Sequence, residues 1–250
     1  MSHLSILEAP AQIICYPRPS EEERHERIRE IQDLGVYALL PGGRTVIDGY
    51  RIIGKGCVSL AVLAESEAGR AVLKIRRVDA NRADMSHEAG MLRLVNSFGV
   101  GPRLLRHSRN LLLLQYIDGL LITDWLCSVQ KEDLMRVKKT LRTLLAQCYR
   151  LDRIHIDHGE LSNASKHVVV RQHDWHPFIL DFESASKKRH VKNLTSMCRF
   201  LFMTAASSDS LNNWRRGIDG EDLRDKLREY KSGPTEKKFM QVLDICKLTE

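Results

Sequence analysis

The sequence predicts an α+β fold with a small N-terminal part, built on an antiparallel sheet, and a larger, mainly helical C-terminal part. Residues 45 to 116 contain short runs of β-branched and aliphatic residues separated by glycines, which is typical of antiparallel strands. After Asp118-Gly119 the apolar residues recur at helical spacing instead. With 250 residues, 43% of them hydrophobic and 28% charged, the chain has an ordinary globular composition and length enough for a substantial core. We therefore divide it into an N-terminal helical extension (1–44), a β-rich part (45–116) and a helical part (117–250).

The N-terminal extension is predicted to contain one strongly charged helix. Ser20 followed by three glutamates has the form of a capping box, and it opens a helix that runs to about Leu34. Ile28 and Ile31 fall on one side of this helix and would dock it. Pro41-Gly42-Gly43 then predicts a turn.

The β-rich part is predicted to begin with three antiparallel strands, over residues 46–53, 57–65 and 70–77. A helix over about residues 81–98 follows, and Gly99-Val100-Gly101-Pro102 ends it. Two further apolar strands are expected, over 103–107 and 110–116.

The C-terminal part is predicted to be built around a helix over residues 131–152. Its apolar residues follow a period of 3.6, as expected for a helix with one buried face. Two short strands, over 167–171 and 177–181, flank a polar turn. The remaining helices are expected over residues 193–204, 220–231 and 235–248.

The charge balance suggests an anionic partner, because 39 Lys and Arg residues outweigh 32 Asp and Glu residues and leave a net charge of +7. The six cysteines are scattered without a Cys-x-x-Cys pair, which argues against a disulfide scaffold or a zinc ribbon and favours reduced thiols. No signal peptide or membrane-spanning run is present in the sequence. We therefore expect a soluble cytoplasmic protein with no membrane partner.

Two groups of residues in the β-rich part have the character of a phosphate site. Gly54-Lys55-Gly56 lies between two predicted strands, where glycines let backbone amides approach anionic oxygens, and Ser59 follows at once. Lys74 lies within an apolar strand, where an ammonium needs an anionic partner. Glu88, on the helix that follows, is the candidate partner.

Two acidic residues in the helical part stand on either side of a short predicted hairpin. Glu160 lies in the loop His158-Gly159-Glu160-Leu161-Ser162-Asn163-Ala164-Ser165-Lys166-His167, and Asp181 follows the second strand in Asp181-Phe182-Glu183. Such a pair of carboxylates can orient a hydroxyl and hold Mg²⁺ on a nucleotide.

In this order the motifs resemble the protein-kinase set of glycine-rich loop, strand lysine, helix glutamate, H-R-D-type loop and D-F-G-type loop. The loop form His-Gly-acid-Leu-Ser is similar to that of RIO-type kinases and of the archaeal kinase subunit of the KEOPS complex. The H-G-E-L-S…K-H loop and the D-F-E-S motif most resemble a group of predicted archaeal serine/threonine kinases. The resemblance covers about residues 52–201. It implies a bilobal protein-kinase-like fold, ATP and Mg²⁺ as cofactors, and an atypical serine/threonine protein kinase that could phosphorylate itself.

The resemblance also implies a role for each motif residue. Gly54, Gly56 and Ser59 would cover the nucleotide phosphates. Lys74, paired with Glu88, would contact the α- and β-phosphates, while Lys55 would add positive charge. The main chain of Gln115-Tyr116-Ile117 would contact adenine. Asp181 would bind Mg²⁺, and Glu160 would replace the catalytic aspartate and accept or orient the substrate proton.

The loop departs from the kinase pattern where the second metal ligand is expected. Ser165 stands in place of the usual asparagine, so the ligand is Asn163, Ser165 or neither, and the adjacent Lys166 could neutralise phosphate charge instead. Glu183 replaces the glycine of the D-F-G-type motif. The chain from Asp181 to the next predicted helix leaves no room for a long activation loop.

Alternatives to an active protein kinase therefore stay open. The substitutions at Glu160 and Ser165 keep a pseudokinase possible, a nucleotide-binding regulatory module that acts on a protein or ribonucleoprotein partner. A small-molecule kinase shares the fold, but it usually has an H-x-D loop with a downstream asparagine. The basic run from Lys187 to Lys192 is either a solvated loop or a docking patch for RNA or an acidic protein.

Overall fold

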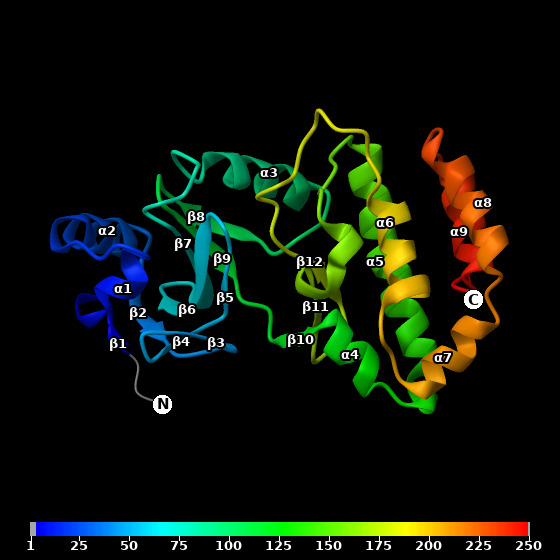
Figure 1. The fold of residues 1–250 in the computed structure, drawn as a ribbon, viewed down its shortest axis with the longest axis horizontal. Coiled ribbons are helices and arrows are strands. Elements are labelled where there is room, and N and C mark those ends of the chain that lie inside the picture. Colours follow the sequence, from blue (N-terminus) through cyan, green and yellow to red (C-terminus); the bar gives the residue numbers. More distant parts are fainter. Residues whose placement is uncertain (1–3, 250) are drawn as a thin grey trace. The chain divides into compact units, whose positions relative to one another are not determined.

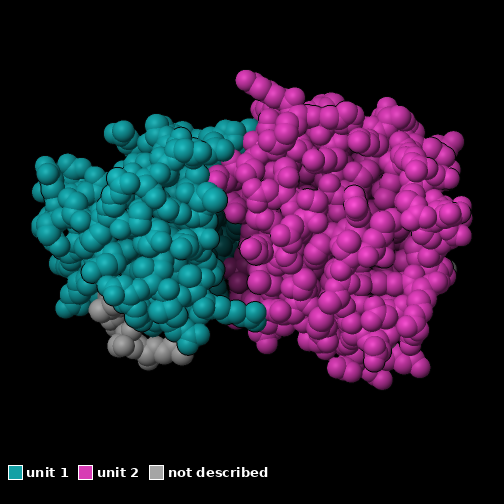
Figure 2. Space-filling model, viewed as in Figure 1, with its two compact units in different colours: residues 1–96, 102–116 teal, residues 97–101, 117–250 magenta. Residues whose placement is uncertain are grey.

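The computed structural model describes residues 4–249, and these form two compact units (Figure 2). Unit 1 contains the described residues up to Asn96 together with Pro102–Tyr116, and unit 2 contains Ser97–Gly101 and the chain from Ile117 onward. Each unit combines antiparallel strands with helices, so the predicted α+β class is confirmed.

Unit 1 is built on an antiparallel sheet of seven strands, in the order β1-β2-β6-β7-β9-β8 with β5 paired to β6 (Figure 1). Its long central strands are β6 (Ser59–Ser66) and β7 (Gly69–Arg76), whose inward residues are buried. The other strands are β1 (Leu4–Ser5), β2 (Val36–Leu40), β5 (Gly54–Lys55), β8 (Leu104–His107) and β9 (Leu111–Gln115).

One predicted strand of unit 1 is wrong. Residues 46–53 do not form a continuous strand but the hairpin β3 (Thr45–Ile47) and β4 (Tyr50–Ile52). Asp48 and Gly49 form the tight turn that joins β3 to β4. Their φ angles are positive, 47° and 77°, as such a turn requires. An Asp-Gly dipeptide is a strong turn signal, and here it interrupts an otherwise continuous β-branched run.

The predicted N-terminal extension also differs from the structure. Residues 1–44 do contain helices, η1 (Ile6–Glu8), α1 (Ala11–Ile14) and α2 (Glu21–Asp33), but β2 lies there too and pairs with β6 in the sheet of unit 1. Buried Ile28 and Ile31 of α2 belong to the same core as the sheet residues, as their spacing predicts. The segment is therefore an integral part of unit 1.

A side chain accepts a hydrogen bond from a first-turn amide where each of the two longer helices of unit 1 begins. The Ser20 hydroxyl accepts a hydrogen bond from the Glu23 amide, so α2 begins as the capping-box pattern predicts. The other helix, α3 (Ser86–Ser97), begins later than the predicted residue 81. There the Asp84 carboxylate accepts a hydrogen bond from the Ser86 amide at 2.8 Å.

Unit 2 contains a small antiparallel sheet and a set of helices (Figure 1). The sheet has the order β10-β11-β12, with strands Gly119–Leu121, Val168–Arg171 and Pro177–Ile179. The longest helix, α5 (Leu134–Arg153), buries the predicted apolar face. The others are α4 (Ile122–Ser128), η2 (Lys131–Asp133), η3 (Leu161–Lys166), α6 (Asn193–Arg199), the π-helical η4 (Phe200–Thr204), α7 (Asp209–Arg216), α8 (Gly220–Lys231) and α9 (Glu236–Ile245).

Within residues 4–249, no helix has both the length and the apolar character needed to cross a lipid bilayer. All six cysteines carry free thiols, of which only Cys57 and Cys127 are exposed.

Candidate active site

The predicted strand lysine and helix glutamate form an ion pair within unit 1. Lys74 on β7 donates hydrogen bonds from Nζ to both carboxylate oxygens of Glu88 on α3, at 2.7 and 2.9 Å. Lys74 is 8% exposed and Glu88 3%, so both charges are largely removed from water. A charge pair at such a depth is maintained only when the geometry is good, because desolvation of either partner alone is expensive.

The predicted glycine-rich segment forms β5 and the turn into β6. Gly54 has open space where a side chain would project, whereas the Gly56 amide already donates a hydrogen bond to the Ser59 carbonyl at 2.8 Å. Lys55 Nζ lies 3.2 Å from the Tyr16 hydroxyl and over the Tyr16 ring. Ser59 is buried at the start of β6. Gly54 is therefore the residue of this segment whose backbone a ligand could approach without displacing another group of unit 1.

The predicted adenine contacts lie at the end of β9. Gln115 is the last residue of this strand, and Tyr116 and Ile117 follow it. Gln115 is fixed at the strand end, because its amide donates to the Arg103 carbonyl at 2.9 Å and its side-chain oxygen accepts from the Arg103 amide. The Arg70 guanidinium lies 5.9 Å from the centre of the Tyr116 ring. Tyr116 and Ile117 are both partly exposed.

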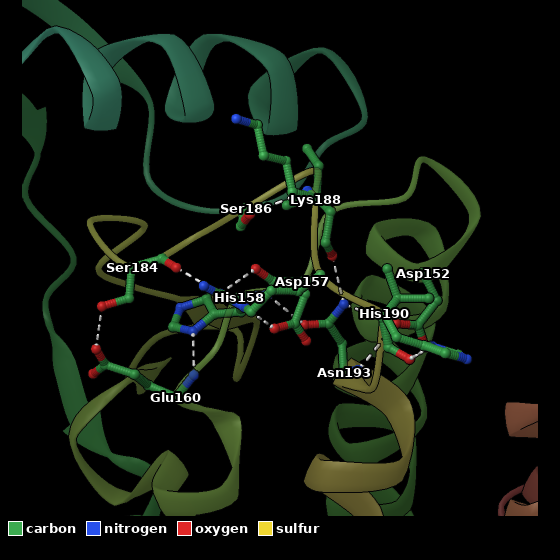
Figure 3. A network of polar contacts seen from close by, with 12 residues as sticks. Asp152, Asp157, His158, Glu160, Ser184, Ser186, Lys188, His190 and Asn193 are labelled. Atoms are coloured by element: carbon green, nitrogen blue, oxygen red, sulfur yellow. Dashed lines mark hydrogen bonds and ion pairs between the residues drawn. The ribbon is translucent and has the colours of Figure 1, made fainter.

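His158 packs against the Asp181-Phe182-Glu183 segment in unit 2. Its Nε2 donates a hydrogen bond to the Leu180 carbonyl at 2.8 Å, and its ring lies edge-on to the Phe182 ring with centroids 5.0 Å apart. The second ring nitrogen, Nδ1, faces the Glu160 amide at 3.4 Å (Figure 3). This arrangement is that of a neutral imidazole protonated on Nε2, and burial lowers the pKa of His158 to about 4.

The lowered pKa of His158 predicts a loss of stability in mild acid. An unfolded histidine titrates near 6.5, so between pH 6.5 and 4 the unfolded chain binds a proton that the folded chain does not. We expect this one residue to remove up to about 3 kcal/mol of stability as the pH falls through that window, and none above it. Side-chain ¹⁵N spectra in EDTA buffer should show an Nε2-protonated ring that does not titrate above pH 5. Titration of His158 near 6.5 would contradict the expected burial.

Both carboxylate oxygens of Glu160 are engaged inside unit 2. Oε1 accepts a hydrogen bond from the Ser184 hydroxyl at 2.5 Å, and Oε2 lies 2.9 Å from His167 Nε2 (Figure 3 shows the Ser184 contact). The sequence predicts no role for either partner. His167 is the last residue before β11, and Ser184 directly follows the Asp-Phe-Glu motif.

Asp181 follows β12 and has a positive φ of 66°, which is unusual for a residue other than glycine. Its Oδ2 lies 3.9 Å from His167 Nδ1. Ligand atoms of Glu160, His167 and Asp181 all lie within 4.8 Å of one another, close enough to share a metal ion. The structure thus brings together the two predicted carboxylates, with a histidine between them.

The residues predicted as a second metal ligand bond to each other. The Ser165 hydroxyl donates to Asn163 Oδ1 at 2.6 Å on an exposed stretch of η3. Lys166, which was the candidate for neutralising phosphate charge, is exposed.

Gly159 shapes the loop by allowing a close approach. It has a φ of 93°, and a Cβ there would lie 2.5 Å from Arg189 Nη2. Arg189 in turn bonds the Asp157 carboxylate at 2.8 Å and the Ser184 carbonyl at 2.6 Å. One member of the basic run 187–192 therefore ties the Glu160 loop to the Ser184 turn, whereas Lys187, Lys188, His190 and Lys192 are exposed.

A buried polar network supports the loop (Figure 3). Asn193 Oδ1 accepts a hydrogen bond from the His158 amide at 2.9 Å, and its Nδ2 donates to Asp152 Oδ1 at 2.7 Å and to the Ile156 carbonyl. Burial raises the pKa of Asp152, while hydrogen bonds from Leu194, Tyr230 and Asn193 oppose that shift. In the sequence, the sign of this network is Asp152, an acidic residue on the apolar face of a long helix.

Comparisons with known proteins find similarity over part of this chain. No protein-family model matches the sequence. An uncharacterized protein of Methanocaldococcus jannaschii is 26% identical over 120 residues, which cover 47% of this chain and 98% of that protein. The chain is therefore similar, over about half its length, to an archaeal protein that is described as uncharacterized.

Proposed function

We propose that the protein is an ATP- and Mg²⁺-dependent phosphotransferase, an atypical RIO-like serine/threonine protein kinase with a bilobal kinase-like fold. The observation that carries the proposal is the buried Lys74–Glu88 pair, in which both carboxylate oxygens hold one ammonium. An enzyme that contacts phosphate oxygens through a strand lysine needs that lysine held in a fixed position. Burial of both charges makes a purely surface role for the pair a poor explanation.

The chemistry of the donor set in unit 2 fits the same reaction. Asp181 offers a partly exposed carboxylate at the end of a strand, and hard oxygen donors are those that Mg²⁺ prefers. His158 fixes the main chain beside it through the Leu180 carbonyl. ATP would supply the transferable phosphoryl group, Lys74 would position and neutralise its phosphates, and Asp181 would hold the Mg²⁺ that shields them.

Glu160 would orient the acceptor hydroxyl, and its hydrogen bond with Ser184 indicates how. The Ser184 hydroxyl already donates to Oε1 at 2.5 Å, so a substrate hydroxyl would take the same oxygen by displacing it. The same observation favours the second candidate, a nucleotide-binding pseudokinase. A carboxylate with both oxygens engaged is a poor proton acceptor until one partner leaves.

Transfer of label from γ-³²P-ATP in the presence of Mg²⁺ tests the proposal. We expect label on the chain itself or on a generic serine-rich acceptor. Nucleotide binding without any transfer would support the pseudokinase, and neither binding nor transfer would refute both candidates.

Gly54→Ala is expected to weaken ATP binding without loss of stability. The added Cβ meets no protein atom within 4 Å, so unit 1 tolerates it, but it occupies space that a phosphate would need. We expect roughly tenfold weaker binding, or about 1.4 kcal/mol, by calorimetry. Gly90→Ala, at an exposed position of α3 with open space, is the matched control and should leave affinity unchanged. Equal affinity in wild type and Gly54→Ala would show that this loop does not approach the nucleotide.

A further inference from the structure

We infer that His167 Nδ1 and the Asp181 carboxylate are ligands of a divalent transition-metal ion, and that Glu160 positions His167 by holding its other ring nitrogen. The inference deepens the proposed function and rests on it for any role toward ATP. The site itself is argued from contacts within unit 2 alone. It moves the second metal ligand from Asn163 or Ser165 to His167, and it makes a transition-metal ion, in place of the Mg²⁺ of the proposed function, the ion expected at Asp181.

The first observation is an unpartnered nitrogen. His167 is 8% exposed, and within the described part of the chain its buried Nδ1 has no hydrogen-bond partner. A buried polar atom left unsatisfied costs about 1–3 kcal/mol, so most such atoms in native proteins have a partner. A ligand on Nδ1 would remove this cost.

The second observation is the direction of the other ring nitrogen. Nε2 lies 2.9 Å from Glu160 Oε2, which is the distance of a hydrogen bond from a protonated nitrogen to a carboxylate. Donation from Nε2 leaves Nδ1 with its lone pair. Histidines that bind metals usually donate their second nitrogen to a carboxylate or carbonyl in this way, which fixes the ring and raises its basicity.

The third observation is the separation between the two proposed ligand atoms. Nδ1 and Asp181 Oδ2 are 3.9 Å apart, which is too long for a hydrogen bond. Two metal–ligand bonds of about 2.1 Å span up to roughly 4.2 Å, so one ion fits between these atoms. Water or phosphate oxygens would complete its coordination.

The donor types select among divalent cations. Mg²⁺ prefers an all-oxygen octahedral shell, whereas an imidazole nitrogen beside a carboxylate favours Mn²⁺ or a later transition metal. The competing explanation is a doubly protonated His167 between two carboxylates. In that case the site would be a charge bridge with no need of a metal.

Titration of the nucleotide-free full chain with MnCl₂, followed by electron paramagnetic resonance, tests the inference. We expect one bound Mn²⁺ whose spin-echo modulation shows coupling to an imidazole ¹⁴N. His167→Asn should abolish this coupling and weaken binding at least tenfold. Glu160→Gln should weaken binding by about 10-fold and retain the coupling, as expected of a positioning residue. His173→Asn, at an exposed histidine of the same unit, is the matched control and should change neither.

Bound Mn²⁺ without ¹⁴N coupling, or equal binding in His167→Asn, would overturn the inference and favour the charge bridge or carboxylates alone. If His167→Asn does not fold, wild-type chain labelled with ¹⁵N-histidine decides instead, because imidazole ligation must change the modulation. The assay contains no nucleotide. A chain that shows the coupling but transfers no phosphate would therefore refute the proposed function and leave the metal site intact. A chain that transfers phosphate but shows no coupling would refute the metal site and leave the proposed function intact.

Discussion

Asp181→Asn is expected to lower the rate of phosphate transfer by roughly 10²- to 10³-fold, the effect of losing several kcal/mol of charge stabilisation at the reacting phosphate. Asparagine keeps the size of the side chain and removes only its charge. It also tolerates the positive φ of 66° at this position, which alanine tolerates less well. Because the Asp181 side chain is 41% exposed, its neutralisation should leave the stability of the fold unchanged.

The measurement is the initial rate of ³²P transfer from γ-labelled ATP, beside a thermal unfolding curve of each variant. Asp225→Asn is the matched control, because it neutralises a carboxylate that is 64% exposed on α8 and pairs with the exposed Arg228. It should transfer at the wild-type rate. Transfer by Asp181→Asn at the wild-type rate would show that Asp181 holds no metal needed for the reaction, even if the chain binds ATP.

Local chemistry explains which parts of the site could be predicted from the sequence. A lysine within an apolar strand must find an anion, and Glu88 on the next helix is the acidic residue that the short connection brings within reach. The position of His158 beneath Phe182 was likewise predictable, since its loop and the strand that precedes Asp181 are joined by a single hairpin. In both cases a single short connection or hairpin joins the two partners, and the burial of one demands the other.

Other contacts were not predictable in the same way. The pairing of β2 with β6 depends on a sheet edge that no local pattern in residues 36–40 reveals. The hydrogen bond between Asp152 and Asn193 joins residues that are 41 positions apart. The sequence around either residue does not indicate the other as its partner. His167 was visible in the loop, but its importance follows from the unpartnered Nδ1, which only the three-dimensional arrangement shows.

Asp152→Ala is expected to be among the most destabilising single changes in unit 2, with a loss of about 3 to 5 kcal/mol in the free energy of unfolding. Its carboxylate accepts four hydrogen bonds, from the Asn193 amide and side chain, the Leu194 amide and the Tyr230 hydroxyl. All four donors would remain buried without this acceptor, and each unsatisfied group has a desolvation cost.

Tyr230→Phe is the graded comparison, because it removes one of the four donors and leaves the acceptor in place. We expect it to cost about 1 kcal/mol, the usual value of a single hydrogen bond. Urea unfolding followed by tryptophan fluorescence measures both variants.

Since Asn193 also holds the His158 amide, Asp152→Ala should loosen the Glu160 loop and lower any phosphate transfer, whereas Tyr230→Phe should not. A loss below 1 kcal/mol in Asp152→Ala would mean that other groups replace the carboxylate as acceptor, and the loop would then owe its position to the Arg189 contacts instead.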